Sequence, residues 1–596
     1  MSEAAKLHAS SGTILNVEHS LLGKQWLARD VDDRTARMLS QRFELPDALG
    51  RVLAGRGLDE ETAPSYLAPS LRDSLPDPSH LLDMDTAAER VAVAIMQSET
   101  VAIFGDYDVD GATSTALLLR YLNDVGGRGI FHIPDRIKEG YGPNTNALLA
   151  LGKKGASVII TVDCGTASYQ PLADAQNAGL DVIVVDHHVA EAQLPAALAV
   201  VNPNRLDETS ALGHLAAVGL VFVLLVAVNR ALRAHGWFKT RPEPDLMSYL
   251  DLVALGTVCD VVPLRGLNRA YVRQGLKVMA KRHNAGLAAL ADVSGLDELP
   301  KAYHLGFVLG PRVNAGGRVG ASDLGTRLLS SNDSVMARGF AEQLDEFNRE
   351  RRLIEAAVQE AAIAAVEADS GDDAAFIVAV GEGWHPGVIG IVAGRLKERY
   401  DRPAAVIAFD GDMGVASARS VPGVDLGAVV IAARQAGLLV KGGGHPMAAG
   451  FSVSRDRLAE AKAFMNERIA ARIDVAGIKP TLTLDGVLSA RGASLDLAQS
   501  LEELGPFGSG NPEPRFALSA QTIKFSKPVG DNHLSLSLGD GGGTLKAIAF
   551  RAFDGPLGPA LVGHQGRLFH IAGRLKVDTY RGDTKVSVQV EDAAPA

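Results

Sequence analysis

The chain has 596 residues, of which 47% are hydrophobic and 22% charged, and its formal net charge at pH 7 is −11. This length exceeds what one hydrophobic core supports, so we expect three or four domains. The negative charge argues against a non-specific nucleic-acid binder, which usually carries a basic footprint. Two cysteines, Cys164 and Cys259, exclude a disulfide framework and fit a reducing cytoplasm.

The longest apolar run covers residues 215–228, which is fourteen residues, whereas a membrane span needs about 20. We therefore predict a buried core helix there. The first residues lack a basic segment followed by an apolar stretch and a small-residue cleavage site, so we expect no secretory signal. Together these features predict a cytoplasmic protein that does not contact a membrane.

The N-terminal half changes from helices to alternating strands and helices. Residues 1–75 are assigned to an N-terminal helical region. Within residues 76–300, apolar strands are predicted at 100–104, 129–133, 157–162 and 181–185, and helices at 112–125 and 169–178. Strands that alternate with helices predict a parallel, doubly wound sheet covered on both faces. Residues 213–290 are expected to be mostly helical.

The C-terminal half contains three further parts. In the connecting segment 301–370, residues 334–369 have a long helical periodicity without proline. A second α/β unit is predicted within 371–474, with strands at 375–380 and 404–408 and a helix at 388–400. In residues 475–596, short alternating strands and glycine-rich turns predict a small antiparallel β-barrel. The expected fold class is therefore α/β with a C-terminal barrel.

Acidic residues follow three of the predicted parallel strands, and a fourth acidic residue ends a predicted helix. The strand ends carry Asp106-Tyr107-Asp108-Val109-Asp110, Asp163, and Asp186-His187-His188, and the helix ends at Asp260. Each piece alone is a weak signal, because aspartate and glycine are common turn residues after strands. The carboxyl ends of parallel strands meet at one edge of the sheet, so we expect these groups to converge.

Such a concentration of carboxylates would repel itself unless cations or protons neutralise it. Oxygen ligands with a minority of imidazoles suit Mn²⁺ or Mg²⁺, and the absence of a cysteine cluster argues against structural zinc. Two metal ions about 3.5–4 Å apart can share a water, lower its pKa and stabilise the charge on a phosphate under attack. The pattern therefore predicts phosphodiester hydrolysis.

These motifs resemble those of the DHH phosphoesterase superfamily and, within it, the RecJ branch. Asp108-x-Asp110 resembles the first motif, Asp163 the second, Asp186-His187-His188 the third, and Gly256-Thr257-Val258-Cys259-Asp260 the fourth. The resemblance implies that residues 76–300 form the DHH catalytic domain and that the site binds two Mn²⁺ or Mg²⁺ ions. The implied ligands are Asp106, Asp108, Asp110, Asp163, His187 and Asp260, while His188 is expected to contact the scissile phosphate.

Further motifs extend this resemblance over residues 20–590. Trp384–Gly390 and Gly443–Gly450 resemble the DHH-associated, substrate-binding domain (371–474), and Leu504–Phe516 resembles the start of the RecJ oligonucleotide-binding (OB) fold (475–596). Another RecJ-like segment is Gly310–Arg318, which we interpret as a glycine-rich loop. The substrate-binding residues implied are Arg312, Asn314, Arg318, Arg395, Arg419, Gly443, Gly444 and His445.

The resemblance also implies the activity, which is 5′-to-3′ exonuclease action on single-stranded DNA that releases 5′-mononucleotides during recombination and repair. Single-stranded DNA is then the main partner, a single-strand-binding protein and a recombination helicase are further candidates, and a monomer is expected. Two alternatives stay open. One is a DHH phosphodiesterase for short oligonucleotides or cyclic dinucleotides, and the other is a DNA-binding replication scaffold without catalysis.

Some residues have competing interpretations. We expect Arg312 and Arg318 to contact phosphate, because a glycine-rich loop lets them approach it, whereas the arginines between 338 and 352 are expected on a solvated helix with i,i+4 ion pairs. Phe307, Trp384 and Phe507 could stack on bases, but core positions are favoured. The two cysteines are expected to be buried, inert thiols.

Overall fold

The computed structural model describes residues 12–368, 374–476, 480–580 and 583–596. The chain divides into two compact units. Unit 1 comprises residues 1–74, 264–270 and 479–596, and unit 2 comprises residues 75–263 and 271–478. The two ends of the sequence therefore belong to one unit, whereas the catalytic-site motifs all belong to the other.

Unit 2 contains a five-stranded sheet with the order β3-β2-β4-β5-β6, in which all neighbouring strands are parallel. Its strands are Thr100–Phe104 (β2), Arg128–His132 (β3), Ala156–Val162 (β4), Asp181–Val185 (β5) and Ala199–Val201 (β6). The central strands are apolar and buried, as expected for a sheet covered on both faces. The predicted doubly wound sheet is confirmed.

Helices alternate with these strands and then continue into a helical region of unit 2, although residues 266–270, at the start of one of these helices, belong to unit 1. The helices are Met84–Met96 (α5), Val109–Asp124 (α6), Thr145–Lys153 (α7), Tyr169–Asn177 (α8), Ala217–Ala234 (α9), Leu250–Cys259 (α10), Gly266–Met279 (α11), Ala285–Val293 (α12), Ala302–His304 (α13), Gly310–Val319 (α14) and Leu324–Ser330 (α15). A π-helical turn, η6 (Leu305–Leu309), joins α13 to α14. Helix α9 is long and apolar enough to cross a membrane, yet 72% of it is buried inside the protein, as predicted for a core helix.

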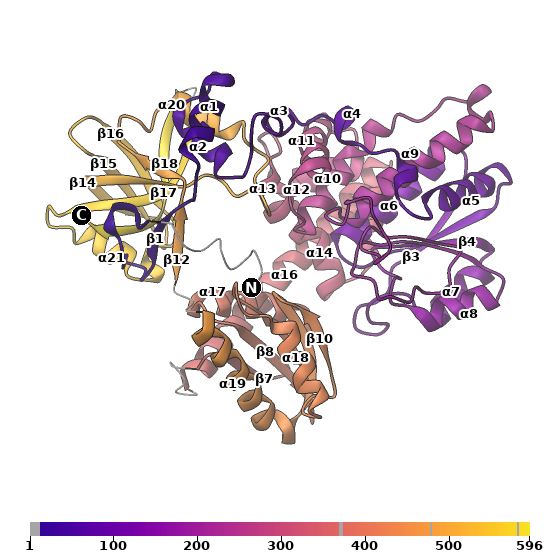
Figure 1. Cartoon of the computed structure of the whole chain (residues 1–596). Helices are drawn as coiled ribbons and strands as arrows, with labels where there is room; N and C mark the ends of the chain where they lie inside the picture. The colour runs from indigo at the N-terminus through magenta and orange to yellow at the C-terminus, as the bar shows by residue number, and fades with distance from the viewer. Residues whose placement is uncertain (1–11, 369–373, 477–479, 581–582) are drawn as a thin grey trace. The chain divides into compact units, whose positions relative to one another are not determined.

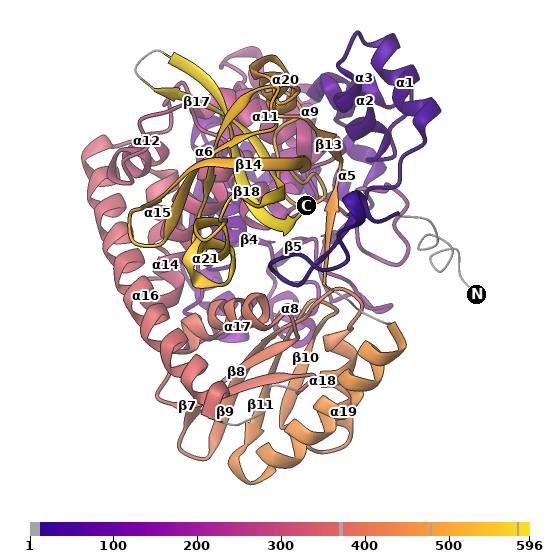
Figure 2. The same cartoon turned by 90° about the vertical axis from the view of Figure 1, so that its left-hand side faces the viewer.

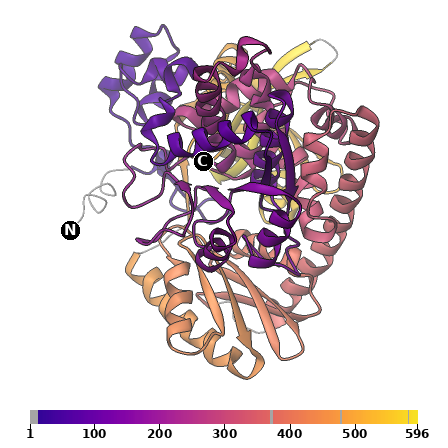
Figure 3. The same cartoon turned by 90° about the vertical axis from the view of Figure 1, so that its right-hand side faces the viewer.

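A 35-residue helix, α16 (Ser334–Ala368), connects this region to a second sheet, and Figures 2 and 3 show its full length. It packs against α12, α14 and α15 near its start and against α17 (Pro386–Tyr400) and β7 further along. The helix predicted over residues 334–369 is confirmed as far as Ala368, and residue 369 lies outside the described residues. Ion pairs from Arg338 to Glu342 and from Arg349 to Asp345 follow the expected i,i+4 spacing, but Arg351 is buried.

The second sheet of unit 2 has the order β10-β11-β9-β8-β7. Its strands are Ile377–Glu382 (β7), Ala404–Asp410 (β8), Met413–Arg419 (β9), Lys441–His445 (β10) and Ala448–Ser454 (β11). One core places α16 and α17 against the sheet, and another places α18 (Leu426–Gln435) and α19 (Leu458–Ala476) against it (Figure 2). This is the predicted second α/β unit.

Unit 1 contains a closed five-stranded barrel in which β14 pairs with both β15 and β17 (Figure 1). The strands are Gly486–Leu488 (β13, beside the barrel), Phe516–Val529 (β14), His533–Gly539 (β15), Thr544–Ala549 (β16), Leu568–Tyr580 (β17) and Asp583–Pro595 (β18), and the helices are Leu495–Glu502 (α20) and Leu557–Val562 (α21). The predicted C-terminal barrel is confirmed, but it is not wholly antiparallel, because β16 pairs with β18 in parallel.

The N-terminal residues pack on this barrel rather than forming a core of their own. Strand β1 (Gln25–Ala28) pairs in parallel with β12 (Thr481–Leu484), and the buried Trp26 donates a hydrogen bond from Nε1 to Asp592 Oδ2 at 3.0 Å. One apolar core joins the barrel to the N-terminal helices Asp33–Arg42 (α1), Asp47–Ala54 (α2) and Ala63–Leu67 (α3). A short helix, Leu71–Ser74 (α4), follows them and has no buried residue.

Candidate active site

The first acidic motif lies where β2 turns into α6. Asp108 caps the helix, because its Oδ1 accepts hydrogen bonds from the amides of Asp110 and Gly111 at 2.9 and 3.1 Å. Asp110 is fully buried, and its two oxygens accept from Ala217 N (2.6 Å) and Val218 N (2.9 Å) at the start of α9. A Cβ at position 111 would lie 2.4 Å from the carbonyl oxygen of Asp106, so this tight turn requires glycine.

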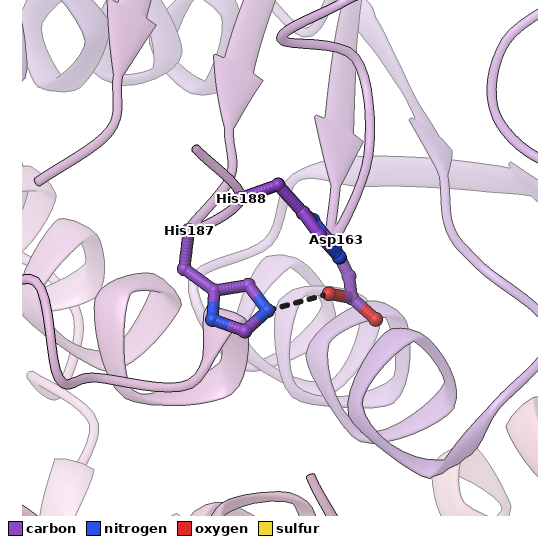
Figure 4. Close-up of side chains that lie close together, drawn as sticks. All are labelled: Asp163, His187 and His188. Atoms are coloured by element: carbon purple, nitrogen blue, oxygen red, sulfur yellow. Dashed lines mark ion pairs between the residues drawn. The ribbon is translucent and has the colours of Figure 1, made fainter. Parts of the chain in front are cut away.

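Strands β4 and β5 deliver the second and third motifs to the same sheet edge. Asp163 follows β4 with φ of 60°, a backbone conformation that costs a non-glycine residue free energy and often occurs at functional sites. The His187 imidazole points toward this carboxylate, with 3.2 Å between Nε2 and Asp163 Oδ1 (Figure 4). Asp260, at the C-terminal end of α10, lies 3.7 Å from the same nitrogen.

Asp186 does not face the metal-ligand set but supports the adjacent histidine. Its Oδ1 lies 2.7 Å from His188 Nδ1 and accepts from the His187 amide at 2.8 Å, while its Oδ2 accepts from Thr166 N at 3.0 Å. Burial favours protonation of Asp186, but the hydrogen bond and charge of His188 outweigh it and lower the pKa. Conversely, burial opposes protonation of His188, and its bond to Asp186 raises the pKa despite this.

The carboxylates that face the site have strongly raised pKa values. Burial, followed by the charge of Asp108, raises the pKa of Asp106 to about 8 and that of Asp110 to about 7. Burial and the neighbouring carboxylates raise the pKa of Asp260 to about 9 and that of Asp163 well above its usual value. His187 shifts the other way: burial, then the charge of His188, lowers its pKa to about 4, so its imidazole is neutral at pH 7.

These properties fit a site for divalent cations. Three groups each place their ligand atoms within 4.8 Å of one another: Asp106, Asp108 and Asp163; Asp110, His187 and Asp260; and Asp163, His187 and His188. Asp106 Oδ1, His187 Nε2 and Asp260 Oδ2 are buried without a hydrogen-bond partner in the described part of the chain. Cations would satisfy these atoms and remove the repulsion that raises the carboxylate pKa values.

Comparisons with known proteins agree with this geometry. Three family models match the chain: the DHH family N-terminal domain over residues 100–257, the DHHA1 domain over 373–471 and the RecJ OB domain over 484–592. The single-stranded-DNA-specific exonuclease RecJ of Dickeya dadantii is 38% identical over 574 residues, which cover 93% of this chain and 97% of that protein. The chain belongs to the RecJ family.

Other RecJ proteins support this assignment. The Bacillus subtilis RecJ is 33% identical over 96% of this chain and 71% of its own length. The crystal structure of Thermus thermophilus RecJ with Mn²⁺ has a TM-score of 0.79 at 28% identity and covers 95% of this chain and 78% of that one. The Mg²⁺ complex of the same protein has a TM-score of 0.74. Thermus thermophilus RecJ therefore binds Mn²⁺ in one structure and Mg²⁺ in the other, and these are the kinds of cation that the candidate ligands here favour.

Two of the predicted substrate-binding arginines gather beside the carboxylates, together with a third that the sequence analysis did not identify. Arg318, at the end of α14, donates from Nη1 to Gly387 O at 2.8 Å; burial, then Arg136 and other arginines, lowers its pKa to about 10. Burial and Arg136 likewise lower the pKa of Arg419, whose Nη1 donates to Ser417 Oγ. The charge of Arg136 also acts to lower the pKa of Asp106, so Arg136 lies near the acidic site.

The missed residue, Arg136, lies in the loop after β3, where the chain continues to Tyr141. The Arg136 guanidinium lies 5.3 Å from the Tyr107 ring, and the Tyr141 hydroxyl donates to Asp163 O at 3.0 Å and lies 3.3 Å from His188 Nδ1. The available signal was the position of this loop at the carboxyl end of a parallel strand, which is where ligands bind in such sheets.

The remaining predicted substrate-binding residues are not all free to bind. Arg312 forms a 2.9 Å ion pair with Asp345 and donates to Val308 O, and Arg395 pairs with Glu398 at 3.4 Å and Glu355 at 3.8 Å. Asn314 lies half-buried on α14. Gly443, Gly444 and His445 lie on the edge strand β10, where the Gly444 position is too close to Ala448 O for a side chain.

The expected glycine-rich loop at Gly310–Arg318 is wrong, because these residues form helix α14. Its glycines permit close packing: a Cβ at Gly317 would lie 2.7 Å from Tyr107 O, and one at Gly310 would lie 2.4 Å from Cys259 Sγ. Tertiary packing thus overrides the poor helix propensity of glycine. Cys164 is buried as predicted, whereas Cys259 is only half-buried, and desolvation raises the pKa of both thiols.

Proposed function

We propose that this chain is a metal-dependent exonuclease that degrades single-stranded DNA from 5′ to 3′ and releases 5′-mononucleotides. The observation that carries the proposal is the convergence of Asp106, Asp108, Asp110, Asp163, His187 and Asp260 at one sheet edge in a RecJ-family chain. Two Mn²⁺ or Mg²⁺ ions held by these residues would lower the pKa of a shared water and neutralise charge on the phosphate.

The protein's own groups then position the substrate. His187 is neutral at pH 7, so it can offer a lone pair to a cation. His188 is oriented by Asp186 and takes the role of contacting the scissile phosphate. A protonated His188 stabilises negative charge that develops there, and Asp186 favours that protonated form.

The arginine cluster of Arg136, Arg318 and Arg419 binds a substrate phosphate. Half-buried guanidinium groups that share few carboxylate partners gain much from an anion, and Arg presents a planar fork that matches phosphate oxygens. The contacts to the DNA are completed by further predicted substrate-binding residues, which are Gly443, Gly444 and His445 on β10 and Asn314 on α14. Arg312 and Arg395 act mainly through the ion pairs that hold α14 and α17 in place.

We divide the sequence into five parts, the last of which is an OB-like barrel over 475–596. This barrel gives the enzyme a second surface that binds the single-stranded DNA substrate. The proposed setting is the cytoplasm, where the chain acts as a monomer in recombination and repair with a single-strand-binding protein and a recombination helicase. A barrel beyond the catalytic unit argues against an enzyme restricted to dinucleotides, and the complete ligand set argues against a scaffold without catalysis.

Substrate discrimination tests the proposal. The purified protein with Mn²⁺ should release mononucleotides from a 40-nucleotide single strand and leave a blunt duplex of the same sequence intact. Preferential hydrolysis of di- to pentanucleotides would instead favour the short-oligonucleotide enzyme. Binding of the 40-mer without hydrolysis in Mn²⁺ or Mg²⁺ would favour the scaffold.

A further inference from the structure

Two aromatic side chains near the active-site helices are exposed and stacked on each other. Tyr303 is 62% exposed and Phe307 67%, and their ring centroids lie 5.1 Å apart with only 25° between the ring planes. Phe307 is more exposed than the other exposed phenylalanines of the described chain, Phe525 and Phe550. The core position favoured by the sequence analysis is therefore wrong for Phe307. Large rings held parallel at a surface are available for contact with another planar group.

The backbone beneath the rings is held firmly rather than loosely. Phe307 lies in the π-helical turn η6, which is buried at Leu305 and Leu309 on either side of it. Single π-helical turns are rare and frequently occur at functional sites. The turn shifts the register between α13 and α14, and it holds Phe307 on the solvent side of a continuous helical segment.

The η6 turn contacts helix α10, which ends next to the candidate metal ligand Asp260. The Cys259 thiol donates from Sγ to Leu305 O at 3.3 Å, and Gly310 leaves space for the sulfur that a Cβ would occupy. Val258 lies 3.5 Å from a Cβ built at Gly306. Asp260 follows Cys259 directly at the end of α10, so the aromatic pair is anchored to the same helix end as the candidate ligand.

Two further large apolar residues are exposed close to the pair in the chain or close to the candidate ligand Asp260. Leu299 precedes Tyr303 by four residues, and Val261 follows Asp260 in a left-handed conformation with φ of 61°. Left-handed backbone is strained for a β-branched residue. Apolar and aromatic side chains beside a phosphodiesterase site suit nucleobases, whose faces stack on aromatic rings independently of sequence.

We infer that Tyr303 and Phe307 form a base-stacking platform that binds nucleobases of the single strand beside the catalytic site, and this inference rests on the proposed function. The platform contacts bases, not phosphates, and so complements the arginine cluster. A duplex keeps its bases stacked inside the helix and cannot offer them to the rings. The platform thus adds a preference for unpaired strands that needs no base-specific hydrogen bond.

Binding to intact and abasic strands tests this inference. Every protein carries Asp163→Ala so that the strand is not cut, and fluorescence anisotropy measures Kd for a labelled 40-nucleotide oligothymidine and for an abasic strand of equal length. Tyr303→Ala/Phe307→Ala should weaken binding of the oligothymidine by about 5- to 150-fold and leave the abasic strand unaffected. Val335→Ala/Leu353→Ala, which truncates exposed apolar residues on α16, is the matched control and should change neither Kd.

A second variant separates loss of the ring from loss of fold. Phe307→Trp keeps an aromatic face and should bind the oligothymidine at least as tightly as the parent, whereas Phe307→Leu should not. Unchanged affinity of the double alanine variant for the oligothymidine would overturn the inference, as would an equal loss on the abasic strand. If the parent itself fails to bind the oligothymidine, the proposed function fails with it, and that result is distinguishable from the others.

Discussion

Replacing Asp186 by asparagine should damage catalysis while leaving metal binding intact. The carboxylate is buried, and its Oδ1 accepts hydrogen bonds from His188 Nδ1 and from the backbone amides of His187 and His188. Its Oδ2 accepts a hydrogen bond from Thr166 N. An asparagine has one acceptor oxygen, so its NH₂ group must face an N–H donor on one side. The substitution also removes the negative charge that favours protonated His188.

The size of the effect follows from the bond to His188. A hydrogen bond to a charged group contributes about 1.5–3 kcal/mol. Because the His188 side chain is 42% exposed, solvent screening places the effect in the lower part of that range, at about 1.5–2 kcal/mol. This corresponds to a fall in kcat of roughly 10- to 30-fold, at 1.36 kcal/mol for each factor of ten. KM should change by less than about 2-fold, since no substrate contact is removed.

Steady-state hydrolysis of a labelled single strand measures both constants, and calorimetric titration with Mn²⁺ measures metal affinity. Asp174→Asn is the matched control, because it makes the same chemical change at a half-buried aspartate on α8, which also accepts side-chain hydrogen bonds but none from a histidine. If Asp186 acts through His188, Asp186→Asn should lower kcat very little when His188 is already replaced by alanine. Additive losses in that double variant, or an unchanged kcat with a lowered Tm, would refute the reasoning.

Three further predictions concern metal, substrate and thiols. In EDTA the raised pKa values of Asp106 (about 8) and Asp260 (about 9) mean that the folded protein binds more protons than the unfolded chain, so Tm should fall as pH rises from about 4 to 9. Added Mn²⁺ should raise Tm most at high pH, and a pH-independent Tm in EDTA would contradict this. Arg318→Lys should raise KM about 10-fold, whereas Arg338→Lys, on the solvated face of α16, should not; equal KM values would exclude the arginine cluster from substrate binding. Replacing both cysteines by serine should leave the sensitivity of the activity to peroxide unchanged, because desolvation raises the pKa of both thiols. A double-serine variant that keeps its activity in peroxide while the wild type loses it would contradict this prediction.

The convergence of the candidate ligands was predictable from the sequence because parallel strands deliver their C-terminal residues to one edge. Predicting where β4 and β5 end is enough to predict that Asp163 and His187 lie close together. Runs of buried β-branched residues in the sequence mark those two strands. The supporting role of Asp186 depends on side-chain direction, which no periodicity encodes. Arg136 was missed because its neighbours Arg318 and Arg419 are far away in the chain.

Glycine and exposed aromatics were harder to interpret. Gly316 and Gly317 suggested a loop, yet they allow α14 to approach Ala321 and Tyr107 closely, which only the packed structure reveals. Phe307 was expected in the core because most phenylalanines are buried. The π-helical turn that exposes it depends on contacts with α10 and is not evident in local sequence.

Hydrolysis of an end-labelled single strand tests the central claim most directly. A 40-nucleotide DNA labelled at the 5′ end, then at the 3′ end, is incubated with Mn²⁺ or EDTA, with Asp163→Ala as the inactive control. We predict immediate release of labelled mononucleotide from the 5′-labelled strand only, dependent on Mn²⁺ and absent in the variant. Release that persists in EDTA or in Asp163→Ala, or that begins at the 3′ end, would contradict the account.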